Sequence, residues 1–396
     1  MATAVGGRPV LHIPCPLCGG RDWLPLDDVR PDRSVRTDGG IVPVALGKYH
    51  CTGCGLAFRP TTEQDLTELY SESYQLYANR PGAEQFDRGR YVNLADGIVA
   101  AWGAAGPPGR VLEVGCGDGS LLEAVAQRWP ETTCIGVEPS LTAVEAAQFR
   151  GRNVVQGVLG ETLPLGVAKG DFDLVYTVHV IEHVSDPAAF LEAAAALTKD
   201  GGRMVVTCPD GATPHAELIH SDHLYSMTPA HLAGFAAMAG LDVLQQGDCP
   251  AGASAEASQL MICAPGSGVP GATVNTDDLG WLYDQRQAYI AAWKGLEAQL
   301  LSALDPDAEL HCFGAGGWAS NIAGYCPALW DRVVACAVDG GGDAEVQGKP
   351  MEDYAALGGR GLQFVIAVNP ASQAKLAERL TRDGHRVLPW PQALAL

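Results

Sequence analysis

Basic residues are scarce in this chain of 396 residues: 26 lysines and arginines face 46 aspartates and glutamates, which gives a formal net charge of −20 at pH 7. The densest basic stretch, residues 375–386, is interrupted by Glu378 and Asp383. Proteins that hold RNA or DNA usually carry clusters of Lys and Arg, because neutralised phosphates supply most of the affinity. We therefore expect a small-molecule substrate and no nucleic-acid partner.

Long apolar segments are absent as well. No run reaches the roughly 20 residues that a membrane-spanning helix requires, residues 1–9 lack the pattern of an export signal, and no short repeat suggests a solenoid. The composition, 47% hydrophobic and 18% charged, is that of a globular protein in solution. We expect a cytoplasmic protein without a membrane partner, a monomer or homodimer, whose length suits two or three domains.

The sequence pattern divides the chain into three segments. Residues 1–76 are rich in Gly, Pro and Asp, whereas 77–265 and 276–396 each alternate strands with helices, which predicts parallel sheets with crossover helices. A linker is expected between the last two, at Pro265-Gly-Ser-Gly-Val-Pro-Gly271. The expected strands are 110–114, 133–137, 173–178, 203–208, 309–313, 332–338, 362–368 and 386–388, and the expected helices are 86–102, 121–129, 142–149, 187–198, 277–304, 319–325 and 371–382.

Four of the 12 cysteines form two pairs with the same spacing, Cys15-Pro-Leu-Cys18 and Cys51-Thr-Gly-Cys54. Each pair can present two thiolates to one ion, so two pairs complete a tetrahedron. We expect one structural Zn²⁺ with no open coordination position; a redox dithiol and a chance pairing are the alternatives. The other eight cysteines are scattered singly, and most are expected to be small core residues.

A glycine-rich turn follows the expected strand at 110–114 in Val111-Leu-Glu-Val-Gly-Cys-Gly-Asp-Gly119. Gly115, Gly117 and Gly119 allow a tight turn and a close approach of the backbone to a ligand at a helix N-terminus. Dinucleotide-binding enzymes use similar turns. With Glu113 in front of the glycines, however, the motif resembles that of class I methyltransferases, which implies that S-adenosylmethionine binds here.

Two further segments are similar to the same class. Glu138 ends the next strand, where a carboxylate can accept both ribose hydroxyls of the cofactor. The segment 171–187 resembles the fourth-strand motif, which implies that His179 faces the methionine end of the cofactor. Glu182 and His183 in that motif are expected to serve packing and capping more than chemistry.

Two tyrosines precede this α/β core. Tyr74 and Tyr77 sit where related enzymes close a lid over the cofactor, and ordinary helix packing is the alternative interpretation. Both residues belong to the stretch between the cysteine pairs and the first expected strand.

Over nearly its whole length, the chain resembles the deoxysugar C-methyltransferases of antibiotic biosynthesis, which act on nucleotide-linked 4-keto-6-deoxy sugars. The resemblance rests on the order of the cysteine pairs, the class I core and a second Rossmann-like unit. It implies an α/β fold with a small zinc-binding domain over 1–76, a methyltransferase domain over 77–265 and a Rossmann-like substrate-binding domain over 276–396.

Methylating a carbon requires a C–H group beside a carbonyl, a general base and stabilisation of the enolate. Asp222-His223-Leu-Tyr225-Ser226 resembles the family's Glu-His-Leu-x-Tyr signature, which implies that His223 is the base, with Asp222 beside it. A neutral imidazole with a pKa of about 6.5 suits that role. Asp222 is shorter than the family's Glu, Tyr225 stands one position early, and His220 replaces a Tyr near the substrate. We predict that His220 assists catalysis and that Tyr225 contacts substrate; a second metal cluster of His220, Asp222 and His223 is an alternative, as is a merely polar loop.

The C-terminal unit has its own glycine-rich turn, Cys312-Phe-Gly-Ala-Gly-Gly-Trp-Ala-Ser-Asn321. Gly316, Ser320 and Asn321 could hold a phosphate or a polar substrate group. The family's Lys in this turn is replaced here, which argues against a diphosphate, and a unit used only for packing and dimerisation is the alternative.

Three other functions remain open from the sequence. One is an O-, N- or C-methyltransferase of another small secondary metabolite. The second is a zinc-bearing rRNA methyltransferase, against which the net charge of −20 argues. The third is a regulator that binds the cofactor without catalysis.

Overall fold

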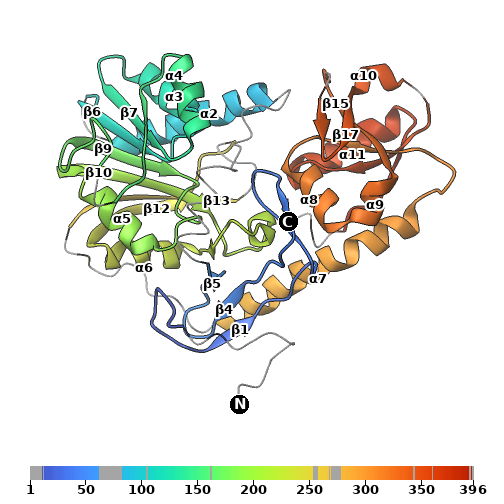
Figure 1. Ribbon diagram of the computed structural model, residues 1–396, viewed down its shortest axis with the longest axis horizontal. Coiled ribbons are helices and arrows are strands. Elements are labelled where there is room, and N and C mark those ends of the chain that lie inside the picture. Colours follow the sequence, from blue (N-terminus) through green and yellow to red (C-terminus); the bar gives the residue numbers. More distant parts are fainter. Residues whose placement is uncertain are drawn as a thin grey trace.

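The computed structural model describes residues 11, 13–61, 83–103, 106–160, 163–252, 257–266, 268, 278–341, 344–358, 360–391 and 394, with side chains omitted for 83–88. Two α/β lobes stand side by side, and the N-terminal strands and the long helix α7 lie beneath them (Figure 1). We refer to residues 11–61 as the N-terminal unit, to 83–268 as the central unit and to 278–394 as the C-terminal unit.

The central unit contains a seven-stranded sheet in the order β12-β13-β10-β9-β6-β7-β8. Six strands run in the same direction, and β13 runs antiparallel to both of its neighbours, β10 and β12. The sequence predicts four of these strands, whereas β8 and the β12–β13 hairpin are not among the expected elements. The strands are β6 (Arg110–Val114), β7 (Thr133–Glu138), β8 (Val154–Gln156), β9 (Phe172–Val178), β10 (Thr198–Pro209), β12 (Leu241–Asp248) and β13 (Ser258–Pro265).

Helices cover both faces of this sheet because alternate residues of each strand point to opposite sides. Val111 and Leu174 pack with α2 (Ala83–Trp102) and α3 (Ser120–Arg128) on one side. Their neighbours Leu112 and Val175 pack with α5 (Pro187–Ala195) and α6 (Pro229–Met238) on the other, and α4 (Leu141–Phe149) packs against α3 and β8. The expected helix at 187–198 ends early, because the β-branched Thr198 already pairs with Phe172 of β9.

The C-terminal unit holds a six-stranded sheet in the order β16-β17-β15-β14-β18-β19, parallel except for β16. Its strands are β14 (Leu310–Phe313), β15 (Val333–Val338), β16 (Glu345–Val346), β17 (Lys349–Asp353), β18 (Gln363–Ile366) and β19 (Arg386–Val387), and its helices are α7 (Leu279–Ala303), α8 (Gly317–Tyr325), α9 (Pro327–Arg332), α10 (Tyr354–Leu357) and α11 (Pro370–Arg382). The expected linker before α7 lies mostly outside the described residues.

The N-terminal unit does not complete its own sheet. Its antiparallel strands β1 (Trp23–Pro25), β4 (Tyr49–Cys51) and β5 (Ala57–Phe58) are joined by β11 (Tyr225–Ser226), which comes from the central unit. The hairpin of β2 (Ser34–Val35) and β3 (Ile41–Val42) packs on α8 of the C-terminal unit. The N-terminal unit therefore contacts both lobes.

Helix α7 ties the C-terminal unit to the N-terminal unit. The fully buried Arg286 donates hydrogen bonds to the carbonyl of Gly55, at 2.6 Å, and to Nδ1 of His50, at 3.0 Å. Two turns further along, Trp293 is completely buried and stacks on Trp318 of α8. One helix thus contributes to two cores at once.

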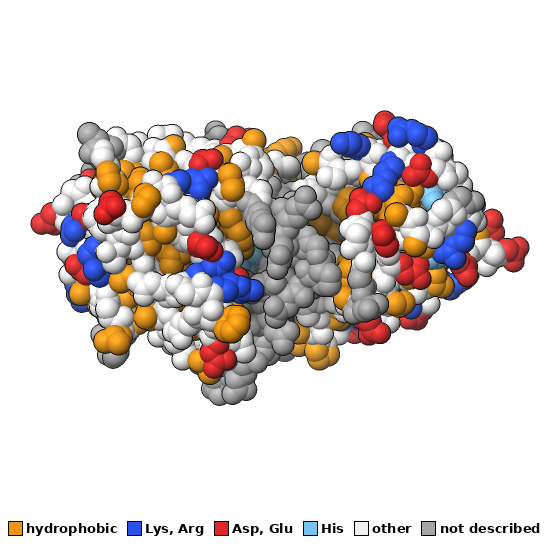
Figure 2. Space-filling model, turned by 90° about the horizontal axis from the view of Figure 1, so that it is seen from above, with side chains coloured by type: hydrophobic (Ala, Val, Ile, Leu, Met, Phe, Trp, Pro, Cys, Tyr) orange, Lys and Arg blue, Asp and Glu red, His pale blue; other side chains and the backbone are white. Residues whose placement is uncertain are grey.

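Charges of both signs are interspersed on the surface. Seen from above, Lys and Arg side chains lie in separate groups with Asp and Glu among them (Figure 2). Within the described ranges, no helix combines the length and the apolar character that crossing a bilayer demands.

His231 couples the stability of the fold to pH. Its Nδ1 accepts a hydrogen bond from the backbone N–H of Thr228, and its Nε2 donates to the carbonyl of Cys54 at 2.7 Å. Burial lowers its pKa from 6.5 to about 4. The unfolded chain therefore binds a proton between these values that the folded chain does not, so this stability is present above pH 6.5 and is lost as the pH falls towards 4.

We expect protonation of His231 at low pH to lower the free energy of unfolding by roughly 3 kcal/mol, because each pKa unit corresponds to about 1.36 kcal/mol. Urea unfolding at pH 7 and pH 4.5 measures it. In the variant His231→Gln the loss should be smaller by about that amount. Equal losses in the variant and in the unmodified protein would contradict the assignment.

Candidate functional site

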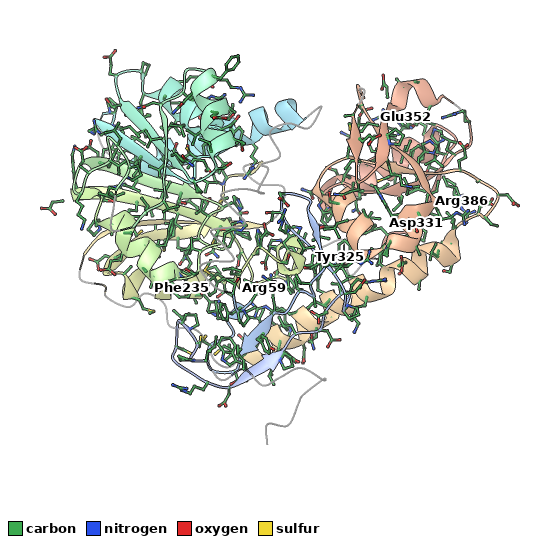
Figure 3. All side chains as sticks on the ribbon, viewed as in Figure 1. Arg59, Phe235, Tyr325, Asp331, Glu352 and Arg386 are labelled. Atoms are coloured by element: carbon green, nitrogen blue, oxygen red, sulfur yellow. The ribbon has the colours of Figure 1, made fainter. Side chains whose placement is uncertain are left out.

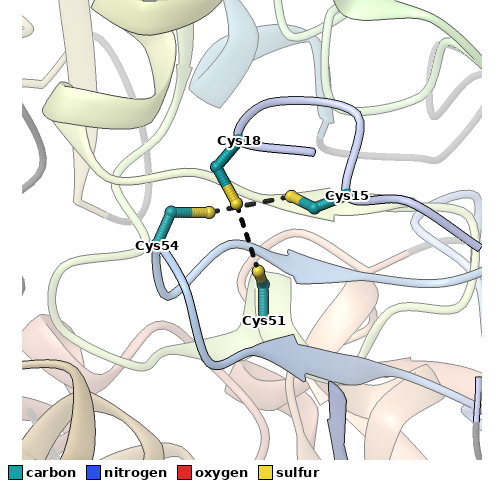
Figure 4. A group of neighbouring side chains, drawn as sticks. All are labelled: Cys15, Cys18, Cys51 and Cys54. Carbon is teal, nitrogen blue, oxygen red and sulfur yellow. Dashed lines mark hydrogen bonds between the residues drawn. The ribbon is translucent and has the colours of Figure 1, made fainter. Parts of the chain in front are cut away.

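Two cysteine pairs come together in the N-terminal unit (Figure 4). The Sγ atoms of Cys15 and Cys54 lie 3.7 Å apart, those of Cys18 and Cys51 lie 3.5 Å apart, and all four thiols are free. Four thiolates at about 2.3 Å from one zinc ion are separated by roughly 3.8 Å. The four side chains therefore fit one tetrahedral ion. Hydrogen bonding to Cys15 and Cys54 already holds the pKa of Cys51 well below its usual value.

We expect one zinc ion per chain bound by these four sulfurs. X-ray absorption of the zinc edge should give four sulfur neighbours at about 2.3 Å. The variant Cys54→Ser should lose this signal and unfold at a lower temperature, because the ion joins two segments of the chain. Cys249→Ser, outside the group, is the matched control. A zinc environment without sulfur would contradict the prediction.

The glycine-rich turn of the central unit joins β6 to α3. Gly115, Gly117 and Gly119 have φ angles of 72°, 54° and 73°, a region that side chains rarely adopt. A Cβ atom on Gly115 would lie 2.3 Å from Cγ2 of Val180. The turn therefore packs directly on the segment that follows β9, and α3 begins immediately after the turn at Ser120, where its N-terminal N–H groups favour an anionic or polar ligand.

Two carboxylates flank this turn. Glu138, at the end of β7, accepts hydrogen bonds from the backbone N–H groups of Gly117 at 2.8 Å and Ser140 at 3.0 Å, and burial raises its pKa. Each carboxylate oxygen has a further lone pair, so Glu138 can still accept ribose hydroxyls. Glu113 is buried, accepts a hydrogen bond from the Tyr176 hydroxyl at 2.9 Å, and has its pKa raised well above the usual value by burial. The residues present fit S-adenosylmethionine.

His179 directly follows β9 and has a positive φ of 54°, which is rare for a residue with a side chain. Strained backbone of this kind concentrates at functional sites. Its Nδ1 lies 3.3 Å from Oε1 of Glu182. The predicted lid residues Tyr74 and Tyr77 lie outside the described residues.

A buried cluster of imidazoles and carboxylates lies where the central unit meets its neighbours. We define the histidine–glutamate cluster as Glu182, His183, Glu217, His220 and His223, all of them buried. The ring of His223 lies 4.7 Å from that of His183 and 5.4 Å from that of His220, between ring centroids. Its Nδ1 lies 3.8 Å from Oε2 of Glu217. Ligand atoms of Glu182, His183 and His223 all lie within 4.8 Å of one another.

Asp222, predicted as the acidic partner of His223, is engaged elsewhere. Its carboxylate accepts hydrogen bonds from the backbone N–H of Thr37, at 2.9 Å, and from the Thr37 hydroxyl. Burial would raise the pKa of Asp222, but the imidazoles of His183 and His223 bring it below the usual value. Glu217 also lies close to His223, with its Oε2 3.8 Å from Nδ1 of that ring. The pairing of Asp222 with His223 stays a prediction, and Glu217 is a further carboxylate beside the ring.

The sequence predicts a neutral imidazole at His223, and its surroundings shift the pKa of the ring further from that of an imidazole in water. Burial first, and then the neighbouring imidazole of His183, lower its pKa well below 6.5. The ring is therefore neutral at physiological pH, with a lone pair, but it is a weaker base than an imidazole in water.

Tyr225, which the sequence predicts to contact substrate, packs between the N-terminal sheet and the central unit. The side chain is 2% exposed and its ring stacks on Phe58 at 5.0 Å between centroids. Its hydroxyl donates to the carbonyl of Ser185 at 2.8 Å. Tyr225 therefore joins the N-terminal sheet to the central unit, because β11 pairs with β5.

Two residues of the C-terminal turn have protein partners in place of the predicted substrate. Gly316 lies at the N-cap of α8. Ser320 accepts a hydrogen bond from Nε2 of Gln347 at 3.0 Å, and Oδ1 of Asn321 lies 3.2 Å from Nε2 of His220. Both side chains are buried. Through Asn321, the C-terminal unit contacts the histidine–glutamate cluster. His220 therefore lies at the boundary between the central and C-terminal units.

Sequence reasoning missed the residues that bring the three units to this cluster. Lys48 of the N-terminal unit is completely buried and donates to the carbonyl of Glu217 at 3.2 Å. The hydroxyl of Tyr325, in the junction between the lobes (Figure 3), hydrogen-bonds with the carbonyl of Ile219. No local pattern marks these contacts. Glu182 belongs to the fourth-strand motif, and the sequence analysis expected it to serve packing. The structure shows that it is buried among imidazoles.

Comparison with known proteins covers the central unit. Residues 86–246 match the family model of a methyltransferase domain. A ubiquinone biosynthesis O-methyltransferase of Rhodopseudomonas palustris is 37% identical over 99 residues, 24% of this chain and 38% of that protein. The corresponding protein of Xanthomonas axonopodis is 34% identical over 153 residues, 34% of this chain and 63% of that protein. The chain spans less than half the length of the first curated relatives it matches.

Solved methyltransferase structures cover about half of this chain. A possible histamine N-methyltransferase of Thermotoga maritima is 22% identical and covers 46% of this chain and 96% of its own, with a TM-score of 0.35. A Haloferax volcanii structure of the Trm112 activator with a methyltransferase covers 52% of this chain and all of that chain, at 16% identity and a TM-score of 0.39. From the family match, the central unit is an S-adenosylmethionine-dependent methyltransferase domain of class I.

Proposed function

We propose that this chain transfers the methyl group of S-adenosylmethionine to a carbon beside a ketone in a small molecule, specifically a nucleotide-linked 4-keto-6-deoxy sugar. The observation that carries the proposal is the histidine–glutamate cluster next to the cofactor turn. Gly115 of the turn packs against Val180, which lies between His179 and Glu182 in the same loop. Cofactor residues and proton-accepting side chains are therefore adjacent.

The cofactor side is held by the turn and by Glu138. S-adenosylmethionine supplies an electrophilic methyl group on its sulfonium. Glu138 would accept the ribose hydroxyls, the N–H groups at the start of α3 would face the cofactor, and His179 would contact its methionine end. Glu138 keeps its position because two backbone N–H groups hold its carboxylate.

Carbon methylation also needs a proton acceptor beside the substrate. His223 is the general base predicted from the sequence, and His220 and Glu217 lie beside it as further groups that can accept a proton. The nucleotide part of the substrate is assigned to the C-terminal unit at the turn around Gly316. The order of the three units supports this assignment, as it matches the deoxysugar C-methyltransferases.

A second candidate is an O-, N- or C-methyltransferase of another small secondary metabolite. The relatives matched by the central unit carry the name O-methyltransferase, and Ser320 and Asn321 have protein partners where a phosphate was expected. This function needs no acidic C–H group in the substrate.

Two measurements test the proposal in order. Calorimetry with S-adenosylhomocysteine, then with thymidine, uridine and guanosine diphosphates, asks which ligands the folded protein binds. A nucleotide-linked ketosugar incubated with the protein in deuterated water should then exchange the hydrogen beside its carbonyl without cofactor. Cofactor binding with neither nucleotide binding nor exchange would favour the second candidate, and no cofactor binding would contradict both.

A further inference from the structure

The carboxylate of Glu182 is buried where few hydrogen-bond donors reach it. Its side chain is 1% exposed, and its Oε1 lies 3.3 Å from Nδ1 of His179, without the alignment of a full hydrogen bond. Burial alone would raise its pKa, yet the contact with His179 and the nearby imidazole of His183 bring the pKa below the usual value. A buried carboxylate with so few hydrogen bonds is unfavourable in a protein interior unless a proton or a cation neutralises it.

The imidazole of His183 is oriented as a metal ligand would be. Its Nδ1 lies 2.8 Å from the carbonyl of Asp222, which can only accept, so Nδ1 carries the proton. In the neutral ring Nε2 then holds the lone pair, and it lies 4.0 Å from Oε1 of Glu182. Metal-binding histidines usually donate their other ring N–H to a carbonyl or carboxylate in this way.

His223 supplies the third ligand position. Its Nδ1 is buried and has no hydrogen-bond partner in the part of the chain that the structure describes. Ligand atoms of Glu182, His183 and His223 lie within 4.8 Å of one another. Ligands at about 2.1 Å from one ion are at most roughly 4.2 Å apart, so a contraction of about half an ångström completes the site.

We infer that Glu182, His183 and His223 bind a divalent transition-metal ion beside the cofactor turn, separate from the four-cysteine site. Two imidazoles and one carboxylate suit ions such as Zn²⁺, Mn²⁺ or Fe²⁺ and leave coordination positions for substrate. The inference rests on the proposed methyl transfer and gives His223 the role of a ligand in place of the base predicted from sequence.

The ion gives the proposed reaction a defined course. A bound ion would polarise the substrate carbonyl and make the neighbouring C–H more acidic. Glu217, whose Oε2 lies 3.8 Å from Nδ1 of His223, would accept the proton, and the C–H electron pair would become that of an enolate whose charge the ion stabilises. The enolate carbon takes the methyl group from the sulfonium, and neutral S-adenosylhomocysteine leaves.

Cobalt binding to the full-length protein tests the site without an activity assay. After a chelator has removed exchangeable metal, Co²⁺ is titrated while its visible spectrum is recorded. We expect one equivalent to bind with d–d bands and without the charge-transfer bands of thiolate ligands. Glu182→Gln and His183→Gln should bind it at least about 10-fold more weakly. Glu192→Gln, which removes an exposed carboxylate from α5, should bind it like the unmodified protein.

Two outcomes would overturn the inference: the unmodified protein binds no Co²⁺ outside the thiolate site, or both variants bind it unchanged. Calorimetry with S-adenosylhomocysteine verifies that each variant is folded. If Glu182→Gln or His183→Gln does not fold, the variant His223→Asn is titrated with Co²⁺ in its place. The Co²⁺ titration needs no cofactor, so it tests the metal site independently of the proposed function. Failure of the proposed function would be seen separately, as an unmodified protein that does not bind S-adenosylhomocysteine.

Discussion

Replacing His223 with asparagine is expected to lower kcat for methyl transfer by roughly 10³-fold, the scale of a missing proton-transfer or electrophilic group. The side chain is buried in the centre of the histidine–glutamate cluster, with His183 and His220 on either side. It makes none of the hydrogen bonds that hold the cofactor turn. The affinity for S-adenosylhomocysteine should therefore change by no more than a few-fold.

Single-turnover kinetics and calorimetry on the same preparation separate the two effects. His385→Asn, a histidine of the C-terminal unit remote from the cluster, is the control and should keep kcat within about two-fold, as surface and remote changes usually do. Near-normal turnover by His223→Asn would remove His223 from the chemistry in either role, base or ligand.

Replacing Glu138 with alanine should weaken the binding of S-adenosylhomocysteine by roughly 100-fold. Two hydrogen bonds from ribose hydroxyls to a carboxylate contribute about 3 kcal/mol together, which corresponds to that factor. The same change frees the backbone N–H groups of Gly117 and Ser140, which Glu138 now binds, so the turn also loses its fixed shape.

Isothermal calorimetry measures this loss, and the thermal shift with ligand should shrink in parallel. Glu145→Ala, which removes an exposed carboxylate from the next helix, is the matched control. If Glu138→Ala bound the ligand as tightly as the control does, the ribose would lie elsewhere and the assignment of the turn would be wrong.

The parts of the site that the sequence predicted are contiguous motifs. The cofactor turn occupies one strand–turn–helix segment, and its glycines take left-handed φ angles that few other residues tolerate. The cysteine pairs are equally local, since each is a short turn. Most strands and helices of the two α/β units were predicted for the same reason, because apolar periodicity is a property of neighbouring residues.

The arrangement that the sequence could not show arises from contacts between distant segments. Tyr225 lies in a motif that resembles a substrate-binding one, but pairing of β11 with β5 buries it against Phe58. Asp222 stands next to His223 in sequence, yet Thr37, 185 residues away, binds its carboxylate. Residues that are adjacent in sequence direct their side chains differently, so sequence proximity is a poor guide to which carboxylate meets an imidazole.

The sequence by itself determined the two α/β units, the four-cysteine group as a candidate zinc site, and the cofactor turn with Glu138, because each depends on short-range spacing. Only the tertiary structure decided that Glu182, His183, Glu217 and His223 form one buried cluster, with Lys48 and Asn321 at its boundary. These residues come from segments whose separation along the chain carries no periodic signal. Their charges and lone pairs interact strongly with one another only where burial excludes water.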